Sequence, residues 1–210
     1  MKKRVIARSL MLFASIFSLG VQAEPKFEED LHYFEVIPAQ PGAEEGKVLV
    51  LEFFWYGCSH CYNLEPHLIN WLRNKPENVE FVPIPAMFSR ANVILHAKTF
   101  YALKLMGVAE QMHVKIFHAM HDEKRRLDTQ DAMEDFLEEN KVDVEAYRKA
   151  MKSFAVQTQA RRAAILAQRF NVQGVPTLVV DGKYTTSGLH GDVMMQVTDY
   201  LIDRVEKEKK

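Results

Sequence analysis

Cysteine is scarce in this 210-residue sequence, which contains two, Cys58 and Cys61. A structural zinc site usually needs about four ligands, commonly from two such pairs, and no second pair is present. A c-type haem site needs histidine directly after the second cysteine, where this chain has Tyr62. A structural disulfide usually closes a long loop, whereas only Ser59 and His60 separate this pair. The pair is therefore predicted to be chemical, with a passive small bridge as the alternative.

Long apolar runs are also missing. Residues 10–19 form an apolar run of ten, about half of the roughly 20 residues that a membrane-spanning helix needs. Four basic residues precede this run, and a Val-Gln-Ala cleavage site follows it at residues 21–23. This three-part pattern predicts a secretory signal peptide at residues 1–23, and therefore an exported protein in an oxidising compartment.

Positive charge is not in excess. Four of the 27 basic residues lie in the predicted leader, which leaves 23 against 28 acidic residues. A nucleic-acid partner would need a basic face, so none is expected. His113, His118 and His121 lie near Asp122, but only His118 and His121 share a helix face at this spacing, so no metal site is expected. No cofactor is expected either.

Hydrophobic periodicity predicts an α/β fold. Residues 47–55 form a continuous apolar run, typical of a strand that is buried on both faces. A helix is predicted at residues 59–73, where Pro66 should kink it. A strand is predicted at residues 78–84, where Pro83 and Pro85 should end it. Further strands are predicted at 177–180 and 183–186, and further helices at 91–106, 110–121, 129–139, 144–151, 155–170 and 192–206.

The helical stretch between the two groups of strands is too long for a simple crossover connection. It predicts an α/β domain in two parts, residues 24–88 and 156–210, with an inserted helical subdomain at residues 89–155.

The Cys-Ser-His-Cys motif directly follows the buried strand and opens a helix. A thiolate at a helix N-terminus faces unpaired N–H groups and the positive end of the helix dipole. His60, if protonated, adds a positive charge nearby. Both effects should lower the pKa of Cys58, which is predicted to be the exposed nucleophile, with Cys61 as the resolving thiol.

Two distant features support a redox site. The segment from Gly174 through Val175 and Pro176 to Thr177 precedes a predicted strand. An X-Pro bond can be cis and Pro176 cannot donate to a ladder, so we expect a turn before this strand. The backbone of Val175 would then be exposed to pair with an extended client strand. Glu52 lies within the apolar run, where a buried acid should have a raised pKa, unless the side chain faces outward.

Residues 50–62 (VLEFFWYGCSHCY), residues 174–177 (GVPT) and the helical insertion between them resemble the thioredoxin-fold superfamily. Within it, they resemble the DsbA family of bacterial periplasmic disulfide-donating proteins. The resemblance implies a thioredoxin fold, a central mixed β-sheet flanked by helices, with an inserted helical subdomain. One departure from the family is Ser59, because Pro-His usually separates the two cysteines. The site residues that the resemblance implies are Cys58 as nucleophile, Cys61 as resolving cysteine, His60 as thiolate stabiliser, Pro176 as a cis-proline lying against Cys58 and Glu52 as buried acid.

The implied function is a monomeric periplasmic oxidase that donates its disulfide to reduced exported polypeptides through a mixed disulfide. A DsbB-like quinone-linked membrane protein would reoxidise it. One alternative is a disulfide isomerase or reductase. Exported isomerases of this fold carry an N-terminal dimerisation domain, for which the 34 residues at positions 24–57 are too few. Another alternative is a redox-silent peptide-binding chaperone, against which the intact cysteine pair argues.

Overall fold

The computed structural model describes residues 27–209, so the predicted signal peptide lies outside the described residues. A five-stranded mixed sheet forms its centre, in the order β1-β5-β4-β2-β3. The central strand β2 pairs in parallel with β3 and antiparallel with β4. The strands are β1 (Phe34–Glu35), β2 (Val48–Phe54), β3 (Val79–Pro85), β4 (Thr177–Val180) and β5 (Tyr184–Ser187).

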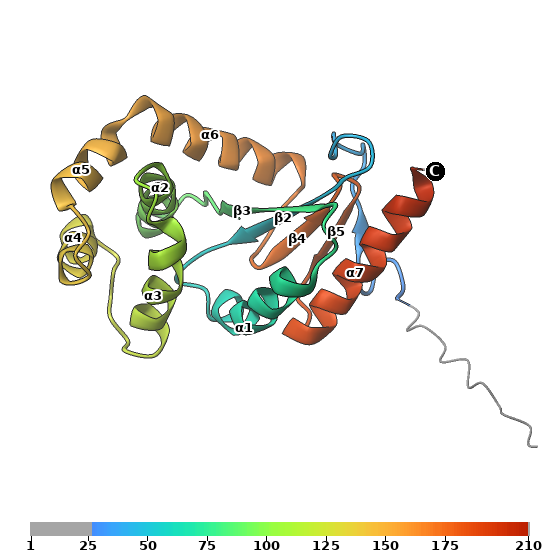
Figure 1. Ribbon diagram of the computed structural model, residues 1–210, viewed down its shortest axis with the longest axis horizontal. Helices are drawn as coiled ribbons and strands as arrows, with labels where there is room; N and C mark the ends of the chain where they lie inside the picture. The colour runs from blue at the N-terminus through green and yellow to red at the C-terminus, as the bar shows by residue number, and fades with distance from the viewer. Residues whose placement is uncertain (1–26, 210) are drawn as a thin grey trace, which may run out of the picture.

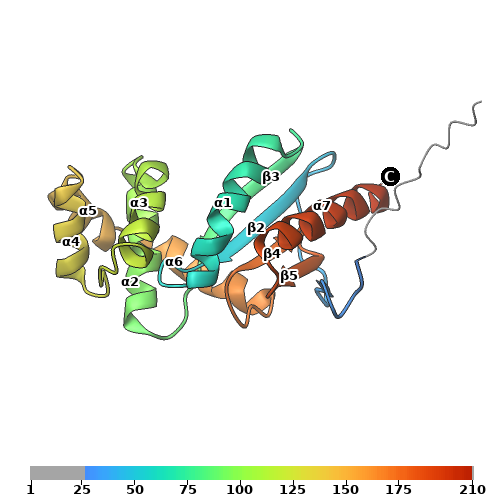
Figure 2. The same cartoon turned by 90° about the horizontal axis from the view of Figure 1, so that it is seen from below.

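Helices cover both faces of the sheet. Helices α1 and α7 lie on one face, and α6 crosses the other face (Figures 1 and 2). Helices α2 to α5 lie together at one end of the sheet (Figure 2). Within residues 27–209, no helix combines the length and the apolar character that crossing a bilayer requires. The helices are α1 (Ser59–Asn74), α2 (Ala91–Leu105), α3 (Ala109–His121), α4 (Gln130–Glu139), α5 (Val144–Lys152), α6 (Phe154–Arg169) and α7 (Gly191–Glu208).

The predicted mixed sheet flanked by helices is confirmed, and each predicted element ends within two residues of its expected bounds. The apolar run of β2 is explained by two packed cores. Val48 and Val50 pack with residues of α1 and α7, whereas Leu51 and Phe53 pack in a second cluster with α2, α3 and α6. Six of the seven residues of β2 are buried and only Leu49 is partly exposed, so the strand shows no polar alternation.

The prediction that Pro83 helps to end the strand is wrong, because β3 continues through Pro83 and ends at Pro85. Among the described residues, strand β3 lies at the edge of the sheet and pairs with β2 alone. The N–H of Ala86 donates to Phe54 O at 2.7 Å, so the backbone nitrogens of Pro83 and Pro85 face the open edge. Proline lacks an N–H to donate, and an edge strand tolerates this loss.

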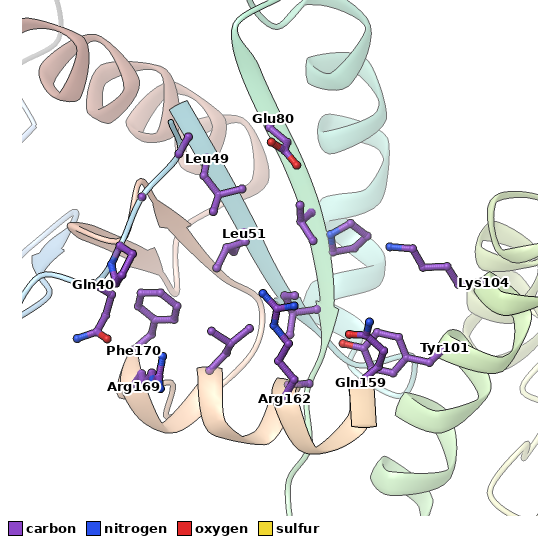
Figure 3. A pocket seen from close by; sticks show the side chains of 18 of the residues that line it. Gln40, Leu49, Leu51, Glu80, Tyr101, Lys104, Gln159, Arg162, Arg169 and Phe170 are labelled. Carbon is purple, nitrogen blue, oxygen red and sulfur yellow. The ribbon is translucent and has the colours of Figure 1, made fainter. Parts of the chain in front are cut away.

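A groove of about 860 Å³ lies between α6 and the face of β2 and β3 (Figure 3). Leu49, Leu51 and Phe170 contribute apolar lining, and Lys104 and Arg162 contribute positive charge. Its lining, all within the described part of the chain, includes neither cysteine. The cysteine pair therefore lies outside this groove.

Candidate active site

The two cysteines occupy the junction between β2 and α1. Cys58 is the N-cap residue of α1, with an extended backbone (φ −92°, ψ 116°), and its Sγ accepts the N–H of Cys61 at 3.5 Å. Both cysteines are free thiols. Cys58 is half-buried and Cys61 is fully buried, so only Cys58 is accessible to another protein. Ser59 and His60 form the exposed start of α1.

The surroundings separate the pKa values of the two thiols. Hydrogen bonding from the Cys61 thiol is the largest effect on Cys58 and lowers its pKa to about 6. Burial opposes this shift, while the backbone N–H groups of Cys61 and His60 add to it, and the charge of His60 contributes least. Burial raises the pKa of Cys61. Near neutral pH Cys58 is therefore a thiolate and Cys61 a thiol. Hydrogen bonds at the helix N-terminus lower the pKa of Cys58 more than the charge of His60 does.

The segment before β4 lies against Cys58. The Val175–Pro176 peptide bond is cis, as predicted. The Cys58 thiol donates to Val175 O at 3.3 Å. The Thr177 hydroxyl donates to Gly174 O at 2.8 Å and closes the turn that precedes β4. The structure thus brings the proline loop and the cysteine motif together, and a main-chain carbonyl lies beside the reactive sulfur.

Glu52 lies in the middle of β2 with its side chain 1% exposed, which excludes the outward-facing alternative. Its Oε1 has no hydrogen-bond partner among residues 27–209. Burial raises the pKa of this carboxyl well above its usual value, and the negative charge of Glu65 raises it further. Burial therefore favours the protonated form of Glu52, and its charge, when it forms, raises the pKa of the Cys61 thiol.

Sequence reasoning missed the residues that hold the loop before Cys58. The side chain of Trp55 bonds to His96, and the backbone and side chain of Tyr56 bond to His121 and His113. A histidine on a predicted helix gives no signal of its partner in the fold. Sequence spacing placed only His118 and His121 on one helix face, whereas His113 and His121, eight residues apart, both bond to Tyr56 in the structure.

Comparison with known proteins places this geometry in a family. The model of the DSBA-like thioredoxin domain matches residues 49–202. Thiol:disulfide interchange protein DsbA of Azotobacter vinelandii is 38% identical over 209 residues, covering 96% of this chain and 97% of that protein. DsbA of Pseudomonas aeruginosa PAO1 is 37% identical over 206 residues, covering 96% of each chain. The crystal structure of Pseudomonas aeruginosa DsbA superposes with a TM-score of 0.80 at 36% identity, covering 87% of this chain and 96% of that chain. This chain therefore belongs to the family of DsbA-like thioredoxin-domain proteins.

Proposed function

We propose that this thiol:disulfide oxidoreductase is a periplasmic oxidase that donates its Cys58–Cys61 disulfide to newly exported proteins. The observation that carries the proposal is the difference between the two thiols. One is accessible with a pKa of about 6, and the other is buried with a raised pKa. The better leaving group is therefore the sulfur that a client can reach.

The exchange proceeds in two displacements. A client thiolate attacks Cys58 Sγ in the disulfide, the S–S bond breaks, and Cys61 leaves with the electron pair. Cys61 then takes up a proton, because burial raises its pKa. Glu52 interacts electrostatically with Cys61, and we propose that its carboxyl, whose pKa is raised by burial, influences this step. A second client thiolate next attacks the client sulfur, and Cys58 leaves as a thiolate.

The direction of transfer follows from thiolate stability. The client loses two electrons, which the Cys58–Cys61 pair gains. Whatever stabilises the Cys58 thiolate stabilises the reduced protein and so makes its disulfide easier to donate. Hydrogen bonds from the thiol and backbone of Cys61 supply that stabilisation, with His60 as a smaller contributor.

Recognition of the client's main chain would let this protein bind client proteins of many different sequences. The carbonyl of Val175, held beside Cys58 by the turn at Pro176, is an acceptor that an extended client backbone can reach. Pairing through backbone atoms provides affinity without demanding a particular sequence. Turnover then needs an electron acceptor, which by family resemblance is a DsbB-like quinone-linked membrane protein. The predicted leader supports a periplasmic location, and the proposed oxidase acts as a monomer without a cofactor.

We also propose the domain division expected from the sequence, with residues 89–155 as a helical subdomain inserted between residues 24–88 and 156–210. The boundary at residue 155 falls in the first turn of α6 (Phe154–Arg169). Residues of α2 to α6 share a hydrophobic cluster with Phe53 and Phe54 of β2. The insertion therefore packs directly against the strand that carries the cysteine motif.

A paired assay tests the proposal. The oxidised protein should convert a reduced two-cysteine peptide to its disulfide stoichiometrically, and a Cys58→Ser variant should not. The reduced protein should catalyse insulin reduction weakly. Insulin reduction faster than peptide oxidation would favour a reductase or isomerase, and peptide binding without thiol exchange would favour a chaperone.

A further inference from the structure

The loop that joins β2 to Cys58 is held by histidines of α2 and α3. The indole N–H of Trp55 donates to His96 Nδ1 at 3.0 Å, and His96 Nε2 lies 2.8 Å from Leu127 O. Because an indole only donates, Nδ1 must accept, and Nε2 carries the hydrogen that Leu127 O accepts. Burial lowers the pKa of His96, which favours this neutral form. His96 therefore bonds at both nitrogens and fixes the Trp55 side chain.

Tyr56 is held at two points by α3. Its hydroxyl lies 3.0 Å from His113 Nδ1, and its backbone carbonyl accepts a hydrogen bond from His121 Nε2 at 2.7 Å. His113 Nε2 lies 3.4 Å from Glu65 Oε1 on α1. A carboxylate accepts, so His113 donates to Glu65 through Nε2 and accepts the Tyr56 hydroxyl through Nδ1. One histidine thus links the loop to the helix that begins after Cys58.

His113, Phe117 and His121 recur every four residues on one face of α3. The Phe117 ring packs against Tyr56 at 5.1 Å between centroids. The His121 ring stacks on Tyr62 at 4.9 Å with an interplanar angle of 8°. Tyr62 directly follows Cys61, so this face contacts the chain both before and after the cysteine pair.

We propose that His96, His113 and His121 are positioning residues for the redox reaction, an inference that rests on the proposed disulfide exchange at Cys58. None of the three hydrogen bonds is to the sulfur; each is to Trp55 or Tyr56.

The anchored loop positions the Cys58 sulfur through contacts between residues that are close in sequence. The N–H of Cys58 donates to Trp55 O at 2.9 Å, so the anchored loop fixes the position of the Cys58 backbone and, with it, the position of the sulfur. A Cβ atom on Gly57 would lie 2.4 Å from the Trp55 ring, so the backbone passes directly against that ring. From this position Cys58 Sγ meets both the Cys61 N–H and Val175 O. A released loop would loosen the hydrogen bonds from Cys61 that stabilise the thiolate.

His121 offers the sharpest test, because it bonds to the backbone and a substitution leaves Tyr56 intact. In His121→Leu, the carbonyl of Tyr56 loses its donor. The glutathione equilibrium should shift toward the oxidised pair by about fivefold, the factor that one net hydrogen bond represents. The pKa of Cys58, followed by thiolate absorbance, should rise. His121→Gln carries an amide donor in a similar place and should restore most of the wild-type equilibrium.

The control is His67→Leu, because His67 is exposed on α1, where its ring lies next to Gly191 of α7. It should leave the equilibrium unchanged. If His121→Leu does not fold, Trp55→Phe decides. It removes the donor to His96 and part of the ring that packs against Gly57, both of which position the loop, and it should shift the equilibrium the same way. Folded variants with wild-type equilibria would overturn the inference. A wild-type protein that does not oxidise dithiols would overturn the proposed function instead.

Discussion

The sulfur of Cys58 lies 3.3 Å from the carbonyl oxygen of Val175, although 117 positions separate the two residues. The antiparallel pairing of β2 with β4 brings them together, because Phe53 lies opposite Thr177. A thiol donates a hydrogen bond to this carbonyl, whereas a thiolate has no hydrogen to donate. Ionisation of Cys58 therefore leaves Val175 O open to a backbone N–H of a client.

The first prediction concerns the ionisation of Cys58. In the reduced protein, thiolate absorbance should rise with a midpoint near pH 6, the pKa that hydrogen bonding at the helix N-terminus produces. At neutral pH, an alkylating reagent should modify Cys58 and spare the buried Cys61. A midpoint near 8.5, the value of free cysteine, would contradict the proposed mechanism.

The second prediction concerns how pH changes the stability of the reduced protein relative to the oxidised protein, which has neither thiol. The pKa of Cys58 is lower in the folded state, so its ionisation stabilises the reduced fold increasingly as pH rises from about 6 to 8.5. The slope is at most about 1.4 kcal/mol per pH unit. Above about 8.5, the raised pKa of Cys61 reverses the slope, because the unfolded chain then loses a proton that the folded chain keeps.

Paired urea melts of the two redox forms between pH 5 and pH 10 measure this difference directly. The difference in the free energy of unfolding should pass through a maximum near pH 8.5. A flat profile would show that Cys58 titrates alike in the folded and unfolded chains. An oxidised form that is more stable at every pH would indicate a structural bridge.

The third prediction ranks the contributors to the low pKa of Cys58. Cys61→Ala removes the thiol hydrogen bond, which is the largest contribution, and should raise the pKa of Cys58 more than His60→Ala does. Cys61→Ser keeps a hydroxyl donor at the same place and should give a smaller rise than Cys61→Ala. Thiolate absorbance of each variant against pH measures the order. A larger effect of His60→Ala would restore His60 as the main stabiliser.

The sequence predicted those parts of the site that depend on neighbouring residues. A buried strand followed at once by a helix places Cys58 at a helix N-terminus, and local spacing is enough to show this. The burial of Glu52 followed from an apolar run without a polar face. The proximity of Pro176 to the cysteines came from the likeness of residues 174–177 to a known motif, since no local pattern joins positions so far apart.

Features that depend on packing between elements were not predictable. The partners of His96, His113 and His121 lie 41, 57 and 65 positions away, and only the folded arrangement of α2 and α3 brings them to the loop. The place of Pro83 inside β3 was also not predictable, because it depends on the order of the strands in the sheet. Whether a strand tolerates proline depends on whether it lies at the sheet edge, and one strand's sequence does not show this.

The last prediction concerns the stability that the protein loses by burying the Glu52 carboxyl. Glu52→Leu removes a carboxyl whose Oε1 has no hydrogen-bond partner among the described residues. The variant should be more stable by about 1–3 kcal/mol near neutral pH, the usual penalty of an unsatisfied buried polar group. Because the folded-state pKa of Glu52 is raised, its titration lowers the stability of the wild type as pH rises above about 4.3, and the variant lacks this contribution.

Stability and activity should change in opposite directions. If Glu52 assists proton transfer at Cys61, Glu52→Leu should oxidise a dithiol peptide more slowly while melting at a higher urea concentration. Glu80→Leu is the matched control, because Glu80 is exposed on β3, and it should change stability by no more than about 0.5 kcal/mol. A Glu52→Leu variant with full peptide-oxidation rates at every pH would leave Glu52 without a part in the exchange.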